Sequence, residues 1–510
     1  MRAAQQPARL TTVPAGMPAS STRRPLAQPR IGTSEVVIAG AAAVTLALAV
    51  LTGDLGILAS ATAMWLFALR FGWAHRRALP MFLWLGFTFF YPHVAQAYTS
   101  LQEKATIEGA LAWAIGLVSF SGAVPALARS RWLVFSLGLW LLWGLMAYVP
   151  VLLTWLNVLP PSDPFALTYS ALKTAVPILG AGGVALAAGA AIREPADLER
   201  LGRAVLVGTG LVAVAALVQA MMGADWINSN YESQAGRLHG VSVPDANGYA
   251  RLLLMPSLLL MALAIAGRHA AWRRGLWLVL VLAVISIALT LSRTTYLSFA
   301  AGIVVLLLLN LRASRTALVG LILAAVLFGA AYGLGIADRF GQGAERRSVA
   351  NLEGRIALYA VLVDIVRENP WFGVRPGGYF EALDEINLQS ETQVSRGGAH
   401  NMVLAIASEW GLPMAFALLA ALAGTIWTSF DALRRLRLAR AAPAAPLLRA
   451  VLTALVAVAV AYLVHGLTEN VPYDHVFVLL GLAAAIRFAV VPALPAQVPT
   501  YAQRGRVLWR

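Results

Sequence analysis

Long apolar runs without a charged residue constrain this chain more than any other feature. The runs GLWLVLVLAVISIALTL (275–291) and VLTALVAVAVAYLV (451–464) lie close to the roughly 20 apolar residues with which a helix crosses a bilayer. Only 12% of the residues are charged, whereas a soluble domain has about a quarter. These runs predict an all-α polytopic membrane protein.

Hydropathy predicts about fourteen transmembrane helices, the last three near 401–430, 447–465 and 474–491. The first 34 residues lack an apolar core followed by a cleavage site, so they are interpreted as a tail and not as a signal peptide. The predicted organisation is a disordered basic cytoplasmic tail at 1–34, helices 1–11 within 35–336, an extracytoplasmic catalytic loop at 337–400, helices 12–14 within 401–491 and a cytoplasmic tail at 492–510.

The net charge of +15 follows the predicted topology. If the first tail is cytoplasmic, basic segments such as RFGWAHRR (70–77) and RRLRLAR (434–440) fall on the same side, and this side holds most of the arginines and few of the acids. That distribution is what the positive-inside rule requires, with both termini cytoplasmic. Nucleic acid is therefore not an expected partner. The absence of cysteine excludes disulfides, thiolate metal sites and thiol nucleophiles.

The long extracytoplasmic loop is expected to be structured. Apolar residues recur at helical spacing within 351–369, at Ile356, Tyr359, Leu362, Val363 and Val366. Pro370 ends this predicted helix, because the residue before a proline avoids the α region. The turn WFGVRPGGYF (371–380) that follows is suited to the membrane interface. A loop this long and structured is usually functional.

Three residues on the extracytoplasmic face are candidates for chemistry. His400 stands where the loop re-enters the membrane, Arg293 lies at the outer end of two apolar spans, and Arg355 opens the loop helix. The alternatives are a helix cap for His400, snorkelling for Arg293 and a solvated helix surface for Arg355. Arginines on an otherwise acidic face are informative, because a guanidinium at membrane depth usually marks function. Three further arginines of this face are candidate substrate-binding residues: Arg237, Arg375 and Arg396.

A histidine beside arginines suits glycan transfer from a lipid-linked diphosphate. The imidazole would take the proton of an acceptor hydroxyl, and the planar guanidinium forks would bind the departing diphosphate. The sequence has no HExxH motif, no close pair of extracytoplasmic histidines and no paired aspartates, and it has no glycine-rich nucleotide loop. No metal site and no cofactor are therefore expected. His465 and His475, ten residues apart, are interpreted as structural.

Four segments in order resemble the O-antigen ligase and O-antigen polymerase superfamily of bacterial membrane glycosyltransferases. They are TLSRTTYLSFAAG (290–302), GRIALYAVLVDIVRENPWFGVRPGGYF (354–380), HNMVLAIASEWGLP (400–413) and HGLTENV (465–471). The resemblance implies a GT-C-like helical fold, an undecaprenyl-diphosphate-linked glycan donor and inverting, metal-independent transfer at the periplasmic face of the inner membrane. It gives His400 the place of the catalytic base, and Arg293 and Arg355 the places of the diphosphate-binding arginines.

Several alternatives stay open at the level of sequence. Arg375 replaces the middle glycine of the family's usual turn, and fourteen spans exceed the dozen common among the ligases, which favours a polymerase or a specialised relative. The acceptor would be lipid A–core for a ligase, another lipid-linked repeat unit for a polymerase, or a protein. A transporter or flippase of a lipid-linked saccharide is the alternative from another class, and it predicts ionisable pairs near the bilayer midplane. The concentration of charge at one face favours catalysis there.

Overall fold

The structure is a computed structural model. Its chain divides into two compact units, Met1–Val44 and Thr45–Arg510, and every described residue belongs to the second. The described residues are 55–72, 76–90, 114–120, 122–124, 128–146, 149, 153, 180–222, 238, 246–266, 270–310, 342–374, 378–379, 382–385, 400–439, 442–469 and 473–494. The predicted tail at 1–34 and most of the tail at 492–510 lie outside them.

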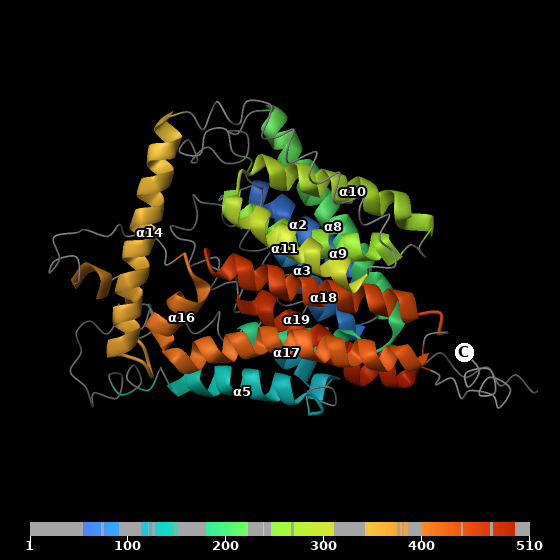
Figure 1. The fold of residues 1–510 in the computed structure, drawn as a ribbon. Coiled ribbons are helices and arrows are strands. Elements are labelled where there is room, and N and C mark those ends of the chain that lie inside the picture. Colours follow the sequence, from blue (N-terminus) through green and yellow to red (C-terminus); the bar gives the residue numbers. More distant parts are fainter. Residues whose placement is uncertain are drawn as a thin grey trace, which may run out of the picture. The chain divides into compact units, whose positions relative to one another are not determined.

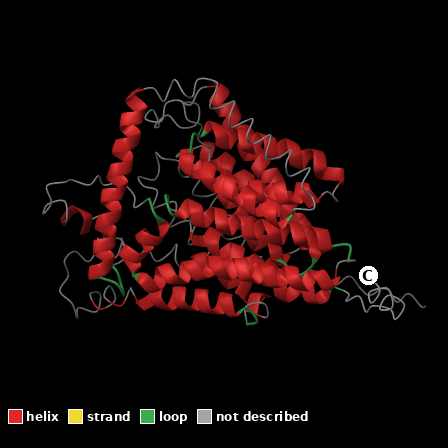
Figure 2. Cartoon of the chain, viewed as in Figure 1, coloured by secondary structure: helices red, strands yellow, loops and turns green. Residues whose placement is uncertain are grey.

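The described residues form helices and turns and contain no strand (Figure 2). The main helices are α2 (Leu55–Gly72), α3 (Leu79–Phe90), α5 (Arg131–Met146), α8 (Pro195–Met222), α9 (Ala246–Ala266), α10 (Ala270–Leu289), α11 (Arg293–Leu309), α14 (Gln342–Glu368), α16 (Met402–Trp410), α17 (Leu412–Leu436), α18 (Ala445–Gly466) and α19 (Tyr473–Ala485). Five helices in the described part are long and apolar enough to cross a membrane: Pro195–Val218, Ala246–Ala266, Leu412–Ala439, Ala445–Gly466 and Tyr473–Ala493. The described part of the chain is thus all-helical, with helices that suit a membrane protein, and the count of fourteen spans stays a prediction.

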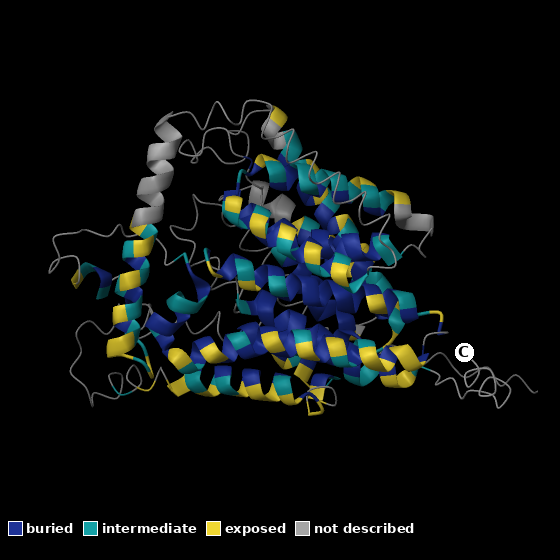
Figure 3. Cartoon of the chain, in the orientation of Figure 1, coloured by how far each residue is buried: buried dark blue, intermediate teal, exposed yellow. Residues whose placement is uncertain are grey.

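Helices α9, α18 and α19 form the centre of the bundle (Figure 3). A helix that is apolar on all sides buries every face, and α18 packs against α9, α11, α17 and α19. The large side chains of Tyr249, Tyr462 and Phe477 are completely buried in these helices. This packed centre fixes the positions of the helix ends, where the polar residues stand.

The outer helices expose large apolar side chains. Leu142 on α5, Leu278 on α10, Leu297 on α11 and Trp427 on α17 are each more than half exposed. Soluble proteins rarely expose so much apolar surface, whereas a bilayer solvates it. The exposed apolar faces therefore agree with the membrane assignment made from helix length and composition.

Helix α14 covers the segment in which helical spacing predicted a helix, and it lies across the ends of the bundle helices (Figure 1). Its residues Leu358 and Leu362 are buried in a small cluster with Tyr379 and Leu383. Leu404 and Ala405 of α16 pack against the same cluster. This contact holds α14 beside the segment that carries His400.

The structure differs from the sequence prediction of one span near 401–430, because two helices, α16 and α17, meet at Gly411. The φ of Gly411 is +86°, a conformation that side chains with a Cβ rarely adopt. A Cβ added there would lie 1.9 Å from the carbonyl oxygen of Trp371. The backbone N–H of Leu412 also donates to the carbonyl oxygen of Pro370 at 2.8 Å. Gly411 thus lets the end of α14 pack against the break.

We expect the substitution Gly411→Ala to destabilise the protein by about 1–3 kcal/mol or more, because it combines a positive φ with a backbone clash. Thermal unfolding in detergent measures the effect. Gly138→Ala is the matched control, since nothing lies within 4 Å of a Cβ at that position on α5. Equal melting temperatures for the two variants would contradict the proposed constraint at Gly411.

Candidate active site

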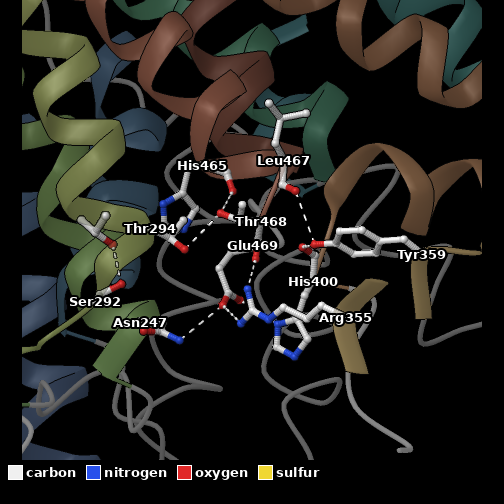
Figure 4. Close-up of polar contacts among 11 residues, drawn as sticks. Asn247, Ser292, Thr294, Arg355, Tyr359, His400, His465, Leu467, Thr468 and Glu469 are labelled. Carbon is white, nitrogen blue, oxygen red and sulfur yellow. Dashed lines mark hydrogen bonds and ion pairs between the residues drawn. The ribbon is translucent and has the colours of Figure 1, made fainter. Parts of the chain in front are cut away.

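Polar side chains from four separate parts of the chain meet at the end of the bundle that α14 crosses (Figure 4). Asn247 comes from the first turn of α9, Arg355 and Tyr359 come from α14, His400 directly precedes α16, and Glu469 belongs to the turn after α18. Figure 4 shows Asn247, Arg355 and His400 grouped around the carboxylate of Glu469.

Glu469 is the centre of this group. Its Oε2 lies 3.1 Å from Nδ1 of His400, and its Oε1 accepts from Nη2 of Arg355 at 3.1 Å. The side-chain amide of Asn247 donates to the same Oε1 at 3.4 Å. The tight turn at the end of α18 fixes the backbone, because the N–H of Glu469 donates to the carbonyl oxygen of His465 at 2.9 Å. One buried carboxylate thus joins three other segments.

The ionisation of Glu469 determines which nitrogen of His400 carries the proton. Burial raises the pKa of the Glu469 carboxyl, but the hydrogen bond and charge of His400, followed by the charges of Arg355 and His465, outweigh burial and lower the pKa below its ordinary value. Glu469 is therefore ionised at neutral pH, and an ionised carboxylate only accepts hydrogen bonds. Nδ1 of His400 must donate, so in the neutral ring Nε2 carries the lone pair.

Arg355 uses part of its guanidinium to hold the same turn. Nη2 donates to Glu469, and Nη1 donates to the carbonyl oxygen of Thr468 at 3.1 Å. These bonds engage two of the five N–H donors of the guanidinium. The side chain is one-third exposed. The two contacts hold the guanidinium in place beside the turn.

The backbone at His400 adopts a conformation that is unusual for a residue with a side chain. Its φ is +47°, and such a conformation costs about 1–3 kcal/mol unless its surroundings hold it. The hydroxyl of Tyr359 donates to the carbonyl oxygen of His400 at 2.8 Å. The next residue, Asn401, accepts from the N–H groups of Val403 and Leu404 and so caps α16. These bonds offset the strain and direct the imidazole toward Glu469.

Arg293 is the first residue of α11 and has an exposed side chain. The hydroxyl of its neighbour Thr294 accepts from the hydroxyl of Thr468 at 3.0 Å. Thr468 directly precedes Glu469, so the start of α11 is attached to the same turn that carries the carboxylate (Figure 4). This contact places Arg293 on an element that borders the group around Glu469.

The structure relates the predicted residues in different ways. It brings His400 and Arg355 together through Glu469, and it places Arg293 at the start of the adjoining helix. The other three candidates, Arg237, Arg375 and Arg396, lie outside the described residues.

Sequence reasoning did not select Glu469, Asn247 or Tyr359 as site residues. Glu469 had a signal, because it belongs to the segment HGLTENV that contributed to the family resemblance. Asn247 and Tyr359 had no comparable signal, since one opens an apolar helix and the other is an apolar-face residue of α14.

The fold and the site define a class: a polytopic helical membrane protein with an Arg–Glu–His cluster at one end of its bundle. Residues 278–419 match the family model described as O-antigen ligase. This match covers part of the chain and confirms the predicted resemblance to the O-antigen ligase and polymerase superfamily. The matched segment contains Arg293, Arg355 and His400, whereas Glu469 and Asn247 lie outside it. No curated protein matches the chain.

We expect Tyr359→Phe to lower stability by about 1 kcal/mol, because it removes the hydroxyl that donates to the carbonyl oxygen of His400 and, at the longer distance of 3.5 Å, to that of Leu467. It should also reduce activity several-fold, since the hydroxyl holds the backbone of His400. Thr425→Val is the control, because it removes a hydroxyl that donates to a backbone carbonyl inside α17. The control should lose similar stability, measured by thermal unfolding, and keep its activity. A similar loss of activity in both variants would argue against a specific effect on His400.

Proposed function

We propose that the protein is a membrane glycosyltransferase that moves a glycan from an undecaprenyl-diphosphate donor to an acceptor hydroxyl. The observation that carries this proposal is the contact of His400 and Arg355 with one carboxylate. In this proposal His400 acts as the general base, and Arg355 beside it binds phosphate oxygens. The match of residues 278–419 to the O-antigen ligase family model supports the same reaction class.

In the proposed reaction, Nε2 of His400 takes the proton of the acceptor hydroxyl as its oxygen attacks the anomeric carbon of the donor sugar. A new carbon–oxygen bond forms, and the bond from that carbon to the diphosphate breaks. The electron pair of the broken bond leaves with the lipid diphosphate, and attack from the opposite side inverts the anomeric centre. General-base assistance of this kind contributes about 10²–10⁴-fold to a rate.

Arg355 and Arg293 have the proposed role of binding the donor diphosphate. Charge on the diphosphate increases as it leaves, so cations that are already in place stabilise the transition state. Guanidinium forks suit this role because they bind two phosphate oxygens at once and stay charged. In this proposal the arginines supply the positive charge without a metal ion.

We propose that the site faces the periplasm, with the protein in the bacterial inner membrane and both termini cytoplasmic. The distribution of arginines under the positive-inside rule supports this orientation. The acceptor would then be lipid A–core or another lipid-linked glycan. His400 and the two arginines serve either acceptor in the same way.

His400→Ala is expected to abolish transfer from an undecaprenyl-diphosphate-linked glycan in vitro and to leave the melting temperature nearly unchanged. Added imidazole should restore part of the activity, because it supplies the missing base. Asp364→Ala is the control, because Asp364 is exposed and forms an ion pair with Arg367 on the surface of α14. Appreciable turnover by His400→Ala without imidazole would remove His400 from the role of general base.

Arg293→Lys and Arg355→Lys should each reduce turnover at least tenfold, because lysine keeps the charge and loses the fork. Arg367→Lys is the matched control on α14, since Arg367 is three-quarters exposed and pairs with Asp364. Initial rates with purified protein in detergent measure the effect. Full activity in both lysine variants would contradict the shared diphosphate site. So would a donor-bound structure with the two guanidinium groups more than about 15 Å apart, since hydrogen bonds span about 3 Å each.

Transfer should continue in the presence of EDTA, because the arginines neutralise the departing diphosphate. The measurement compares initial rates before and after chelation, with a Mg²⁺-dependent glycosyltransferase as the positive control for chelation. Loss of activity with EDTA and its recovery on addition of Mg²⁺ or Mn²⁺ would refute the metal-independent reaction.

A further inference from the structure

Glu469 has a place in the site that the reaction described above does not use. It contributes a negative charge beside a site proposed to bind a diphosphate, and it is buried at the end of the bundle. We propose that Glu469 is the positioning residue of this site: it holds His400 as the base, and its Oε1 occupies Nη2 of Arg355 until an oxygen of the donor diphosphate takes its place. This inference rests on the proposed function.

Glu469 supports His400 in its proposed role as the base. Among the described residues, the charged and titratable groups that contact His400 or its partner carboxylate are Glu469, from the turn after α18, and Arg355 with Tyr359, from α14. When His400 accepts a proton, the positive charge of nearby Arg355 opposes the new charge, and the carboxylate of Glu469 stabilises it. Glu469 thus lets a base function beside a phosphate-binding cation. It also fixes the ring orientation, because Nδ1 must point at Oε2.

Glu469 also occupies a position on Arg355 that the donor is proposed to use. A carboxylate oxygen and a phosphate oxygen are both anionic acceptors for an N–H of a guanidinium. Oε1 of Glu469 therefore occupies a position on Arg355 that an oxygen of the donor can take. The other contacts of Glu469 favour its release from Arg355. Oε2 stays in contact with His400, and Oε1 still accepts from the amide of Asn247. A buried carboxylate left without partners would cost several kcal/mol, and Glu469 never loses them all.

The two parts give opposite expectations for binding and for catalysis. Glu469→Gln keeps the shape of the side chain and removes its charge. Without the competing anion, the donor diphosphate should bind more tightly. Without the carboxylate, proton transfer to His400 should become less favourable. A residue with only a structural role would weaken both quantities together, through loss of folded protein.

The kinetic experiment measures kcat, KM and their pH profiles for glycan transfer by the full-length protein in detergent. We expect Glu469→Gln to lower kcat at least tenfold, to leave the donor KM unchanged or lower, and to move the acidic limb of the kcat/KM profile to lower pH. Glu469→Asp keeps the charge, so the acidic limb of its kcat/KM profile should lie close to that of the unmodified protein. An unchanged profile in Glu469→Gln would overturn the role in positioning the base.

The binding experiment does not depend on turnover, so it separates this inference from the proposed function. The probe is undecaprenyl diphosphate in detergent micelles, titrated onto the full-length protein with thermal unfolding as a check on folding. We expect Glu469→Gln to bind at least threefold more tightly than the unmodified protein, and Arg355→Gln to bind more weakly. In the double variant the gain from Glu469→Gln should disappear, because the fork that it releases is absent.

Each result of the binding experiment has a distinct meaning. Equal or weaker binding by folded Glu469→Gln, with Arg355→Gln still impaired, would overturn the exchange and leave the proposed function intact. If the unmodified protein bound no diphosphate and transferred no glycan, the proposed function itself would fail. If Glu469→Gln did not fold, Asn247→Ala would test the same point. Asn247→Ala removes one hydrogen bond to Oε1 without a change in charge. The carboxylate should then compete more strongly for Arg355, and binding of the probe should weaken.

Discussion

The ion-pair cluster at Glu469 is the interaction on which the rest of the site depends. Three segments distant in sequence contribute to it, through Asn247, Arg355 and His400. A carboxylate removed from water at the end of an apolar bundle is stable only with charged and hydrogen-bonding partners. Because the carboxylate of Glu469 requires these partners, α9, α14 and the start of α16 lie together around it. The contacts that stabilise this end of the bundle therefore also bring Arg355 and His400 together.

The apolar part of the bundle makes this cluster possible. Helices α9 and α18 are buried along nearly their whole length, so their ends are fixed by packing before any polar contact is considered. The break at Gly411 then lets the chain leave the direction of α17 and continue as the short helix α16, beside α14. Without that break, a continuous apolar helix would hold the backbone of this segment in a single line. The tight turn at Gly411 thus contributes to the position of His400.

The sequence predicted those features that depend on local pattern. Apolar runs predicted the membrane helices, and helical spacing predicted the helix that contains Arg355. The break at Gly411 was missed because hydropathy is continuous across it, and one glycine in an apolar run does not reveal a positive φ. The partnership of Glu469 with His400 was missed for a different reason. It is set by which helix ends meet in space, and neither hydropathy nor spacing specifies that.

A carboxylate beside a phosphate-binding arginine looks like a conflict, because it repels the ligand that the arginine is proposed to attract. In the site without a bound donor, however, the carboxylate stabilises the arginine. A guanidinium next to a buried turn needs acceptors, and Thr468 and Glu469 provide them. The affinity lost to the competing anion is offset by a fork that is already oriented when the donor arrives. The arrangement also links the two halves of the proposed chemistry, since a carboxylate that releases Arg355 still holds His400, the residue that must next accept a positive charge.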